Sequence, residues 1–111
     1  MTSVVLTSSR DSVELSVRGH AGSCRTGPDP VCAAASMLVC ALMERLERRR
    51  GELAELHLDY SSGRCELSAV GRGEASVRLH EAIEVVMCGF ELLAASFPKS
   101  VTVSRREDSD A

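Results

Sequence analysis

The sequence contains no tryptophan, asparagine or glutamine, and only two phenylalanines and one tyrosine among its 111 residues. The missing asparagine excludes a papain-like Cys-His-Asn triad, so any group that orients a catalytic histidine must be a carboxylate, a hydroxyl or a backbone carbonyl. With so few aromatic side chains, the core has to be built from Leu, Val, Ala and Met. Lysine is equally scarce, because Lys99 is the only one and nearly all positive charge is arginine.

The chain also lacks an apolar run of the roughly 18 residues that a membrane span needs. Its N-terminal part alternates between polar and apolar residues, which is unlike a secretory signal. The net charge of −3 gives the chain no overall electrostatic affinity for nucleic acid or anionic lipid. The five cysteines are an odd number, and without an export signal we expect a cytoplasmic protein with reduced cysteines.

Hydrophobic periodicity predicts one α+β domain over residues 1–104, followed by a polar C-terminal tail over 105–111. The segments 4–7, 12–18, 54–60, 64–70 and 101–103 read as strands, and 30–49 and 74–96 read as helices. The order is therefore ββαββαβ. The economical architecture packs two helices on one face of a largely antiparallel sheet.

The second predicted helix carries apolar side chains beyond its main stripe, at Val85, Cys88 and Leu92. They could face a partner subunit, which would make the protein a homodimer. They could also widen a stripe that is buried within one subunit. The sequence leaves both interpretations open.

The start of the first predicted helix contains a candidate reactive cysteine. Asp29 suits the N-cap and Pro30 the first helical position, which places Cys32 in the first turn. Oriented amides and the positive end of the helix dipole favour a thiolate there. His20 lies just beyond the second predicted strand, and a loop of about ten residues allows it to reach Cys32. A histidine and a cysteine so placed are the two halves of a cysteine nucleophile, which predicts a small cysteine hydrolase.

In such a hydrolase Cys32 would attack an acyl carbon and His20 would protonate the leaving amine. The backbone amides of Val31 and Cys32 would be the oxyanion donors. Asp29 could instead orient His20, and Ser36, one turn after Cys32, could line the site. The competing interpretation is structural, because cysteine is among the most buried residue types.

The remaining cysteines and histidines suggest little further chemistry. Cys24 could form a disulfide with Cys32 under oxidation, or it could be an incidental loop thiol. No metal site or cofactor is expected, because His20, Cys24 and Cys32 supply three zinc ligands at most. Cys40, Cys65 and Cys88 are expected to be core or helix-face thiols, and His57 and His80 to be solvated.

Two motifs carry a family resemblance. Gly19-His20-Ala21-Gly22, followed by Gly27-x-Asp29-x-Val31-Cys32-Ala33-Ala34-x-Ser36, resembles the ribosomal-processing cysteine protease family, Prp. The spacing from the histidine to the cysteine, the preceding aspartate and the following serine all match its signature. The resemblance extends to the length of the chain and to its ββαββαβ order.

The resemblance implies a bacterial, cytoplasmic and homodimeric endopeptidase. Such enzymes remove an N-terminal extension from large-subunit ribosomal protein twenty-seven, cleaving after a hydrophobic, Phe-containing stretch. By position, Cys32 would be the nucleophile and His20 the general base and acid. Asp29 and Ser36 would be supporting residues, while Gly19 and Gly22 would permit the conformation of the loop.

The sequence departs from the family in the loop between His20 and Cys32. Pro28 and Pro30 flank Asp29 and should stiffen the end of this loop. Ser23 and Cys24 leave the loop without an aromatic residue, which affects the expected substrate contacts more than the chemistry. Two alternatives to the protease remain: a non-catalytic, dimeric ribosome-associated module with a buried cysteine, and a thiol redox sensor that uses Cys24 and Cys32.

Overall fold

The chain begins with a β-hairpin whose two strands supply the centre of the core. β1 (Thr2–Ser8) and β2 (Ser12–Arg18) pair antiparallel, with Leu6 opposite Leu15. Both leucines are 2% exposed, whereas the alternate residues on the other face of the hairpin are mostly polar. This computed structural model describes residues 1–19, 29–61 and 63–108.

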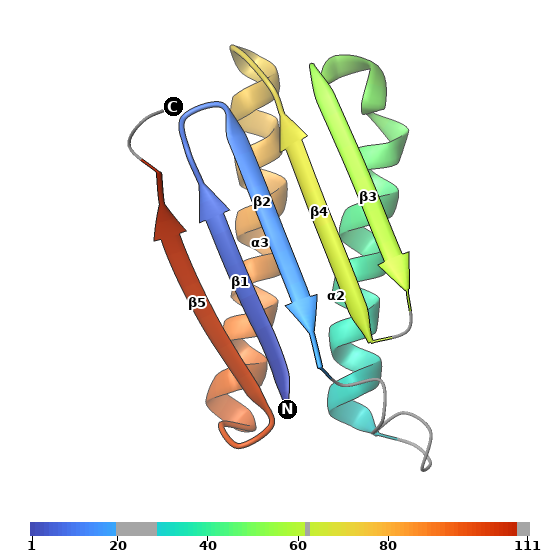
Figure 1. The fold of residues 1–111 in the computed structure, drawn as a ribbon, viewed down its shortest axis with the longest axis vertical. Coiled ribbons are helices and arrows are strands. Elements are labelled where there is room, and N and C mark those ends of the chain that lie inside the picture. The colour runs from blue at the N-terminus through green and yellow to red at the C-terminus, as the bar shows by residue number, and fades with distance from the viewer. Residues whose placement is uncertain (20–28, 62, 109–111) are drawn as a thin grey trace.

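A second hairpin extends the sheet on one side and a single strand closes it on the other (Figure 1). β3 (Glu55–Ser61) pairs with β4 (Arg64–Val70), and β4 pairs antiparallel with β2. β5 (Val101–Glu107) lies parallel to β1. The described strands therefore form one sheet of order β3-β4-β2-β1-β5, with β3 and β5 at its edges.

Two helices cover one face of this sheet (Figure 1). α2 (Pro30–Arg48) and α3 (Glu74–Ser96) pack against each other, and a short 3-10 turn, η1 (Arg50–Glu52), follows α2. The helices meet closely at Gly89, where an added Cβ would lie 2.7 Å from Leu38 Cδ2. Phe90 beside it is fully buried, so its truncation to alanine should cost about 3–5 kcal/mol of stability.

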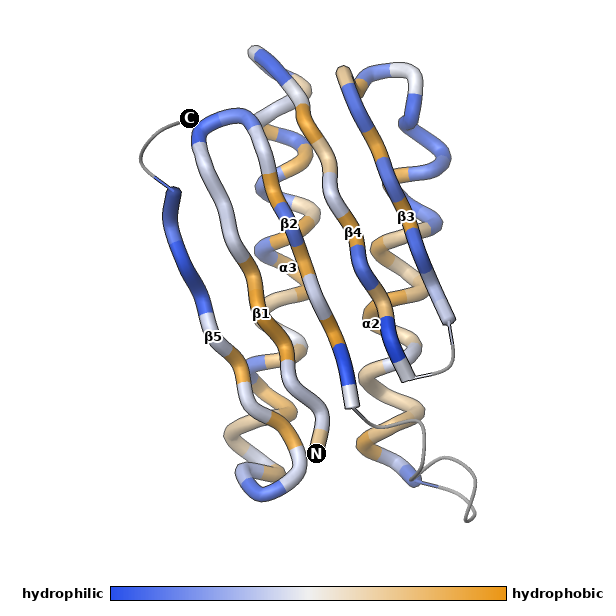
Figure 2. Tube along the Cα trace, viewed as in Figure 1, coloured by the Kyte–Doolittle hydropathy of each residue, from blue (hydrophilic) through white to orange (hydrophobic). Residues whose placement is uncertain are grey.

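The predicted fold class and element order are confirmed, and two details differ. β5 continues to Glu107, although its C-terminal half is hydrophilic and shows no apolar alternation (Figure 2). It is held there by the ladder to β1 and by Arg105, whose guanidinium binds the carboxylates of Glu84 and Glu91 on α3. The apolar residues of the first half of α2 also predict a segment that is buried nearly all round, and this prediction is wrong because Met37 is 67% exposed.

Candidate active site

Asp29 fixes the start of α2. Its backbone is extended, and its Oδ1 accepts hydrogen bonds from the amides of Val31 at 3.0 Å and Cys32 at 3.2 Å. Its carbonyl accepts the first helical bond, from Ala33 at 2.9 Å. Pro30 occupies the first helical position, where its missing N–H leaves no bond unmade. The predicted N-cap is therefore confirmed.

This cap places Cys32 at the third helical position, where the sequence predicts it. Cys32 is 3% exposed, and its sulfur takes part in a disulfide in this structure, contrary to the expectation of reduced cysteines. A substrate can therefore reach the sulfur only after reduction and a movement of neighbouring atoms. The helix N-terminus still supplies the oriented amides and the positive dipole end that favour a thiolate once the bond is reduced.

The same hydrogen bonds occupy the amides that are the expected oxyanion donors. The amides of Val31 and Cys32 already donate to the Asp29 carboxylate in this conformation. A developing oxyanion would have to displace or share that carboxylate, because each N–H makes one strong bond. The carboxylate also brings a negative charge into the turn that holds Cys32, which offsets part of the helix dipole.

The other expected site residues lie partly within and partly outside the described ranges. Gly19 directly follows β2 with a φ of 101°, and its amide donates to the carbonyl of Gly63 at 3.0 Å. Ser36 is half-buried, four residues after Cys32 and on the same side of α2. His20, Gly22 and Cys24 lie outside the described residues, so the predicted contact between His20 and Cys32 stays a prediction.

The other three cysteines in the described part of the chain do not share the setting of Cys32. Burial raises the pKa of the Cys65 thiol to about 11, with a smaller contribution from the charge of Glu66. Cys65 is therefore an inert core residue at neutral pH. Cys40 and Cys88 are exposed, as expected for helix-face thiols.

The two remaining histidines behave differently from each other. His57 is exposed on β3, as predicted. The prediction that His80 is solvated is wrong. Its Nε2 lies 2.8 Å from the carbonyl oxygen of Ser9 and its Nδ1 2.8 Å from that of Ser76. This histidine therefore links α3 to the turn between β1 and β2, a contact that helical periodicity cannot reveal.

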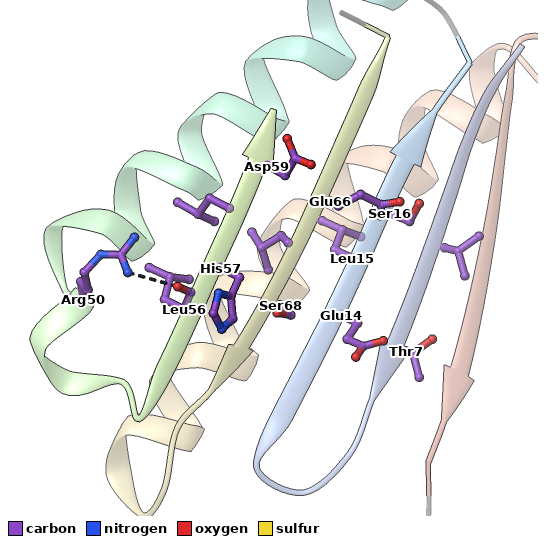
Figure 3. A pocket seen from close by; sticks show the side chains of 13 residues that line it. Thr7, Glu14, Leu15, Ser16, Arg50, Leu56, His57, Asp59, Glu66 and Ser68 are labelled. Carbon is purple, nitrogen blue, oxygen red and sulfur yellow. Dashed lines mark hydrogen bonds between the residues drawn. The ribbon is translucent and has the colours of Figure 1, made fainter. Parts of the chain in front are cut away.

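A well-formed hollow in the described part of the chain lies away from Cys32. It has a volume of about 570 Å³ and lies over the sheet face that the helices leave uncovered (Figure 3). Polar side chains such as Glu14, His57 and Glu66 line it, and the guanidinium of Arg18 already binds Glu66. Among the described residues, no group of three or more His, Cys, Asp and Glu side chains could hold a metal ion. No helix in the described ranges is long and apolar enough to cross a membrane.

The α+β fold of this chain is shared by a class of small proteins with solved structures. SMU.848 from Streptococcus mutans is 24% identical with a TM-score of 0.67, and the match covers 97% of this chain and 96% of that one. The ribosomal processing protease Prp of Staphylococcus aureus, solved with a covalently linked product peptide, is 15% identical with a TM-score of 0.71. That match covers 96% of this chain and 100% of that one.

The same Staphylococcus aureus protease solved with a substrate peptide matches at 12% identity, with a TM-score of 0.71 and the same coverage. No match was found among curated proteins. A family model described as Cysteine protease Prp matches residues 1–102. The chain therefore belongs to the cysteine protease Prp family.

Proposed function

We propose that this chain is a cysteine endopeptidase that removes the N-terminal extension of bacterial large-subunit ribosomal protein twenty-seven. Cys32 is its nucleophile and His20 its general base and acid. The observation that carries the proposal is the placement of Cys32 at the third position of α2, behind the Asp29 cap, in a chain that the family model matches over 1–102. The reaction takes place in the cytoplasm, where ribosomal proteins are made.

The reaction has two stages. In the first, the Cys32 thiolate attacks the carbonyl carbon of the scissile peptide bond, and the protonated His20 donates its proton to the leaving amine. The C–N bond breaks and leaves a thioester between Cys32 and the extension. In the second, His20 takes a proton from water, the resulting hydroxide attacks the thioester, and the Cys32 thiolate leaves.

The observed arrangement of Asp29 indicates a resting state. The carboxylate holds the two amides that would stabilise the oxyanion, and Cys32 is buried and disulfide-bonded. Activity therefore requires reduction of Cys32 and a rearrangement at the start of α2. Assays are accordingly run in the presence of a thiol reductant.

The direct test is cleavage of peptides that carry a hydrophobic, Phe-containing extension, followed by mass spectrometry. The wild type is compared with Cys32→Ala and His20→Ala, and Cys40→Ala serves as the matched control because Cys40 is an exposed thiol on the same helix. We expect cleavage by the wild type and by Cys40→Ala only. Cleavage by Cys32→Ala would exclude Cys32 as the nucleophile.

A thiol redox sensor at Cys32 is the second candidate function, and the disulfide at this sulfur favours it. The two candidates differ in their behaviour once the disulfide is reduced. The endopeptidase then cleaves peptides, whereas a sensor reacts rapidly with thiol reagents but cleaves nothing. A module with a merely structural cysteine would react slowly and also cleave nothing.

The proposed protease is a homodimer that pairs through the outer side of α3. Val77, Val85 and Leu92 are 64–70% exposed there, and Cys88 lies between them on the same side of the helix. Large apolar side chains aligned on one face of a helix are a common partner surface. A charge introduced at Val85 should therefore separate the two subunits.

A further inference from the structure

The outer edge of β3 has backbone groups that no strand pairs in the described part of the chain. The Gly19 amide donates to the carbonyl oxygen of Gly63, and the Gly71 amide donates to that of Asp11. Gly63 and Gly71 flank β4, so the N–H and C=O groups of every second residue, counted from Gly63 to Gly71, point toward β2. The N–H and C=O groups of the intervening residues, such as Glu66 and Ser68, therefore point toward β3, where these residues pair with Asp59 and His57. By the same alternation, the N–H and C=O groups of Leu56, Leu58 and Tyr60 point away from the sheet.

One end of this edge is already closed. Arg50, from η1, donates from its Nη1 to the carbonyl oxygen of Leu56 at 3.1 Å. A strand added along β3 would have to share this oxygen with the guanidinium or displace it. The Arg50 contact thus limits the free edge to Leu58 and Tyr60, which we call the β3 edge.

The β3 edge lies toward the end of the molecule that holds Cys32. β3 runs toward the end of the molecule at which α2 starts, and it stops short of that end (Figure 1). The bond between Gly19 and Gly63 ties the turn after β3 to the end of β2, one residue before His20. Leu58 is half-buried and Tyr60 is 50% exposed, so both present apolar surface beside the free backbone groups.

We propose that the β3 edge binds the peptide substrate as an added, antiparallel or parallel strand. This inference rests on the proposed function and deepens it. The main-chain groups of Leu58 and Tyr60 would bind alternate residues of an extended peptide, and the side chains would contact its apolar residues. Arg50 ends the ladder and so fixes how far the peptide extends. The partner is an extended, hydrophobic peptide segment rather than a folded surface.

The first experiment measures amide hydrogen exchange in the reduced Cys32→Ala variant, with and without a saturating peptide that carries a Phe-containing extension. We expect the amides of Leu58 and Tyr60 to exchange at least tenfold more slowly in the complex. The amide of Asp59, which already faces β4, is the internal control. Unchanged exchange at Leu58 and Tyr60 in a saturated complex would overturn the proposal.

The second experiment leaves the fold of the protein untouched. Peptides are N-methylated at one position at a time, and their affinities for the Cys32→Ala variant are compared. Strand pairing predicts a loss of tenfold or more at alternate positions, because every second peptide N–H faces β3. Equal losses at neighbouring positions, or none, would contradict it.

A matched pair of substitutions tests the edge in the protein itself. Tyr60→Pro removes the outward N–H, and an edge strand tolerates proline where that group faces solvent. Tyr60→Ala removes the same side chain and keeps the N–H. We expect Tyr60→Pro to bind peptide at least tenfold more weakly than Tyr60→Ala, at similar unfolding temperatures.

These outcomes separate the two proposals. Cleavage by the wild type without protection at the β3 edge would overturn the edge proposal alone. A reduced chain that neither binds nor cleaves the peptide would overturn both. Protection that appears without peptide and grows with protein concentration would show a second copy of the chain on this edge, which also overturns the proposal.

Discussion

Gly19 adopts a backbone conformation that glycine alone adopts at little cost. Its φ is 101°, and an added Cβ would lie 2.6 Å from the carbonyl oxygen of Met1. Because that oxygen belongs to the backbone, it cannot move as a side-chain terminus could. Gly19 therefore fixes how the chain leaves β2 immediately before His20.

We predict that Gly19→Ala lowers the free energy of unfolding by about 1–3 kcal/mol, through backbone strain and the clash with Met1. Peptide cleavage should fall as well, because the next residue is His20, the proposed general base and acid. Denaturant unfolding and the cleavage assay measure the two effects. Gly51→Ala is the matched control, since an added Cβ there meets nothing within 4 Å. Equal stability of the two variants would contradict the account.

Asp29 combines a structural role with a position beside the proposed nucleophile, Cys32. Asp29→Ala should lower the free energy of unfolding by about 1 kcal/mol, because the amides of Val31 and Cys32 lose their acceptor. Asp29→Asn keeps a capping oxygen and should retain most of that stability. Thermal unfolding of the three proteins tests this order. A stable Asp29→Ala variant would show that the cap contributes little.

At the scale of elements, α3 has a buried side against the sheet and an exposed apolar side. Val85→Glu places a charge in the middle of the exposed side, which is 69% accessible at that residue. We predict that this variant sediments as a monomer where the wild type sediments as a dimer, with little change in unfolding temperature. Thr102→Glu, exposed on β5, is the control of equal charge. A wild type that is monomeric at micromolar concentration would exclude the dimer.

The elements themselves are predictable from the sequence to a large extent. The sequence predicts residues 12–18, 64–70 and 74–96 with the bounds that the structure shows, because apolar side chains there follow the period of the element. It does not predict the C-terminal half of β5. The residues of that half are all polar, so they show no alternation of polar and apolar side chains. The half is held in place by contacts between Arg105 and two glutamates of α3, which lie far from it in sequence.

The candidate site is less predictable than the fold. The Asp29 cap and the position of Cys32 follow from local preferences, so they can be derived from neighbouring residues. The contact between His80 and the carbonyl of Ser9 joins residues far apart in sequence, and no local pattern signals it. The same holds for the β3 edge, which depends on which strand ends the sheet.

At the scale of the whole molecule, ion pairs set the dependence of stability on pH. Hydrogen bonds from Arg105 to Glu84 and from Arg49 to Glu52 lower the pKa of each carboxyl below its usual value of 4.5. Burial works against a lowered pKa at Glu66, but hydrogen bonds from Arg18 and Ser16 outweigh it. The unfolded chain therefore binds more protons than the folded chain below about pH 4.5.

It follows that the stabilisation from these ion pairs is fully present above pH 4.5 and is lost as the pH drops through the lowered pKa values. We predict that Arg105→Met reduces the difference in unfolding free energy between pH 7 and pH 3. At pH 7 the Arg105→Met variant should lose at most about 1 kcal/mol of unfolding free energy, because the Glu84 side chain is 47% exposed and solvent screens the ion pair. Urea unfolding at both pH values measures it, with Arg106→Met as control.

The most direct test of the central claim is intact-mass spectrometry of the reduced protein, quenched in acid during cleavage of a Phe-containing extension peptide. The proposed mechanism predicts a covalent adduct whose mass gain equals the released extension, bound as a thioester to Cys32. The adduct should be absent from Cys32→Ala and present in Cys40→Ala. Cleavage without any adduct, or with an adduct on another cysteine, would contradict the assignment of Cys32 as the nucleophile.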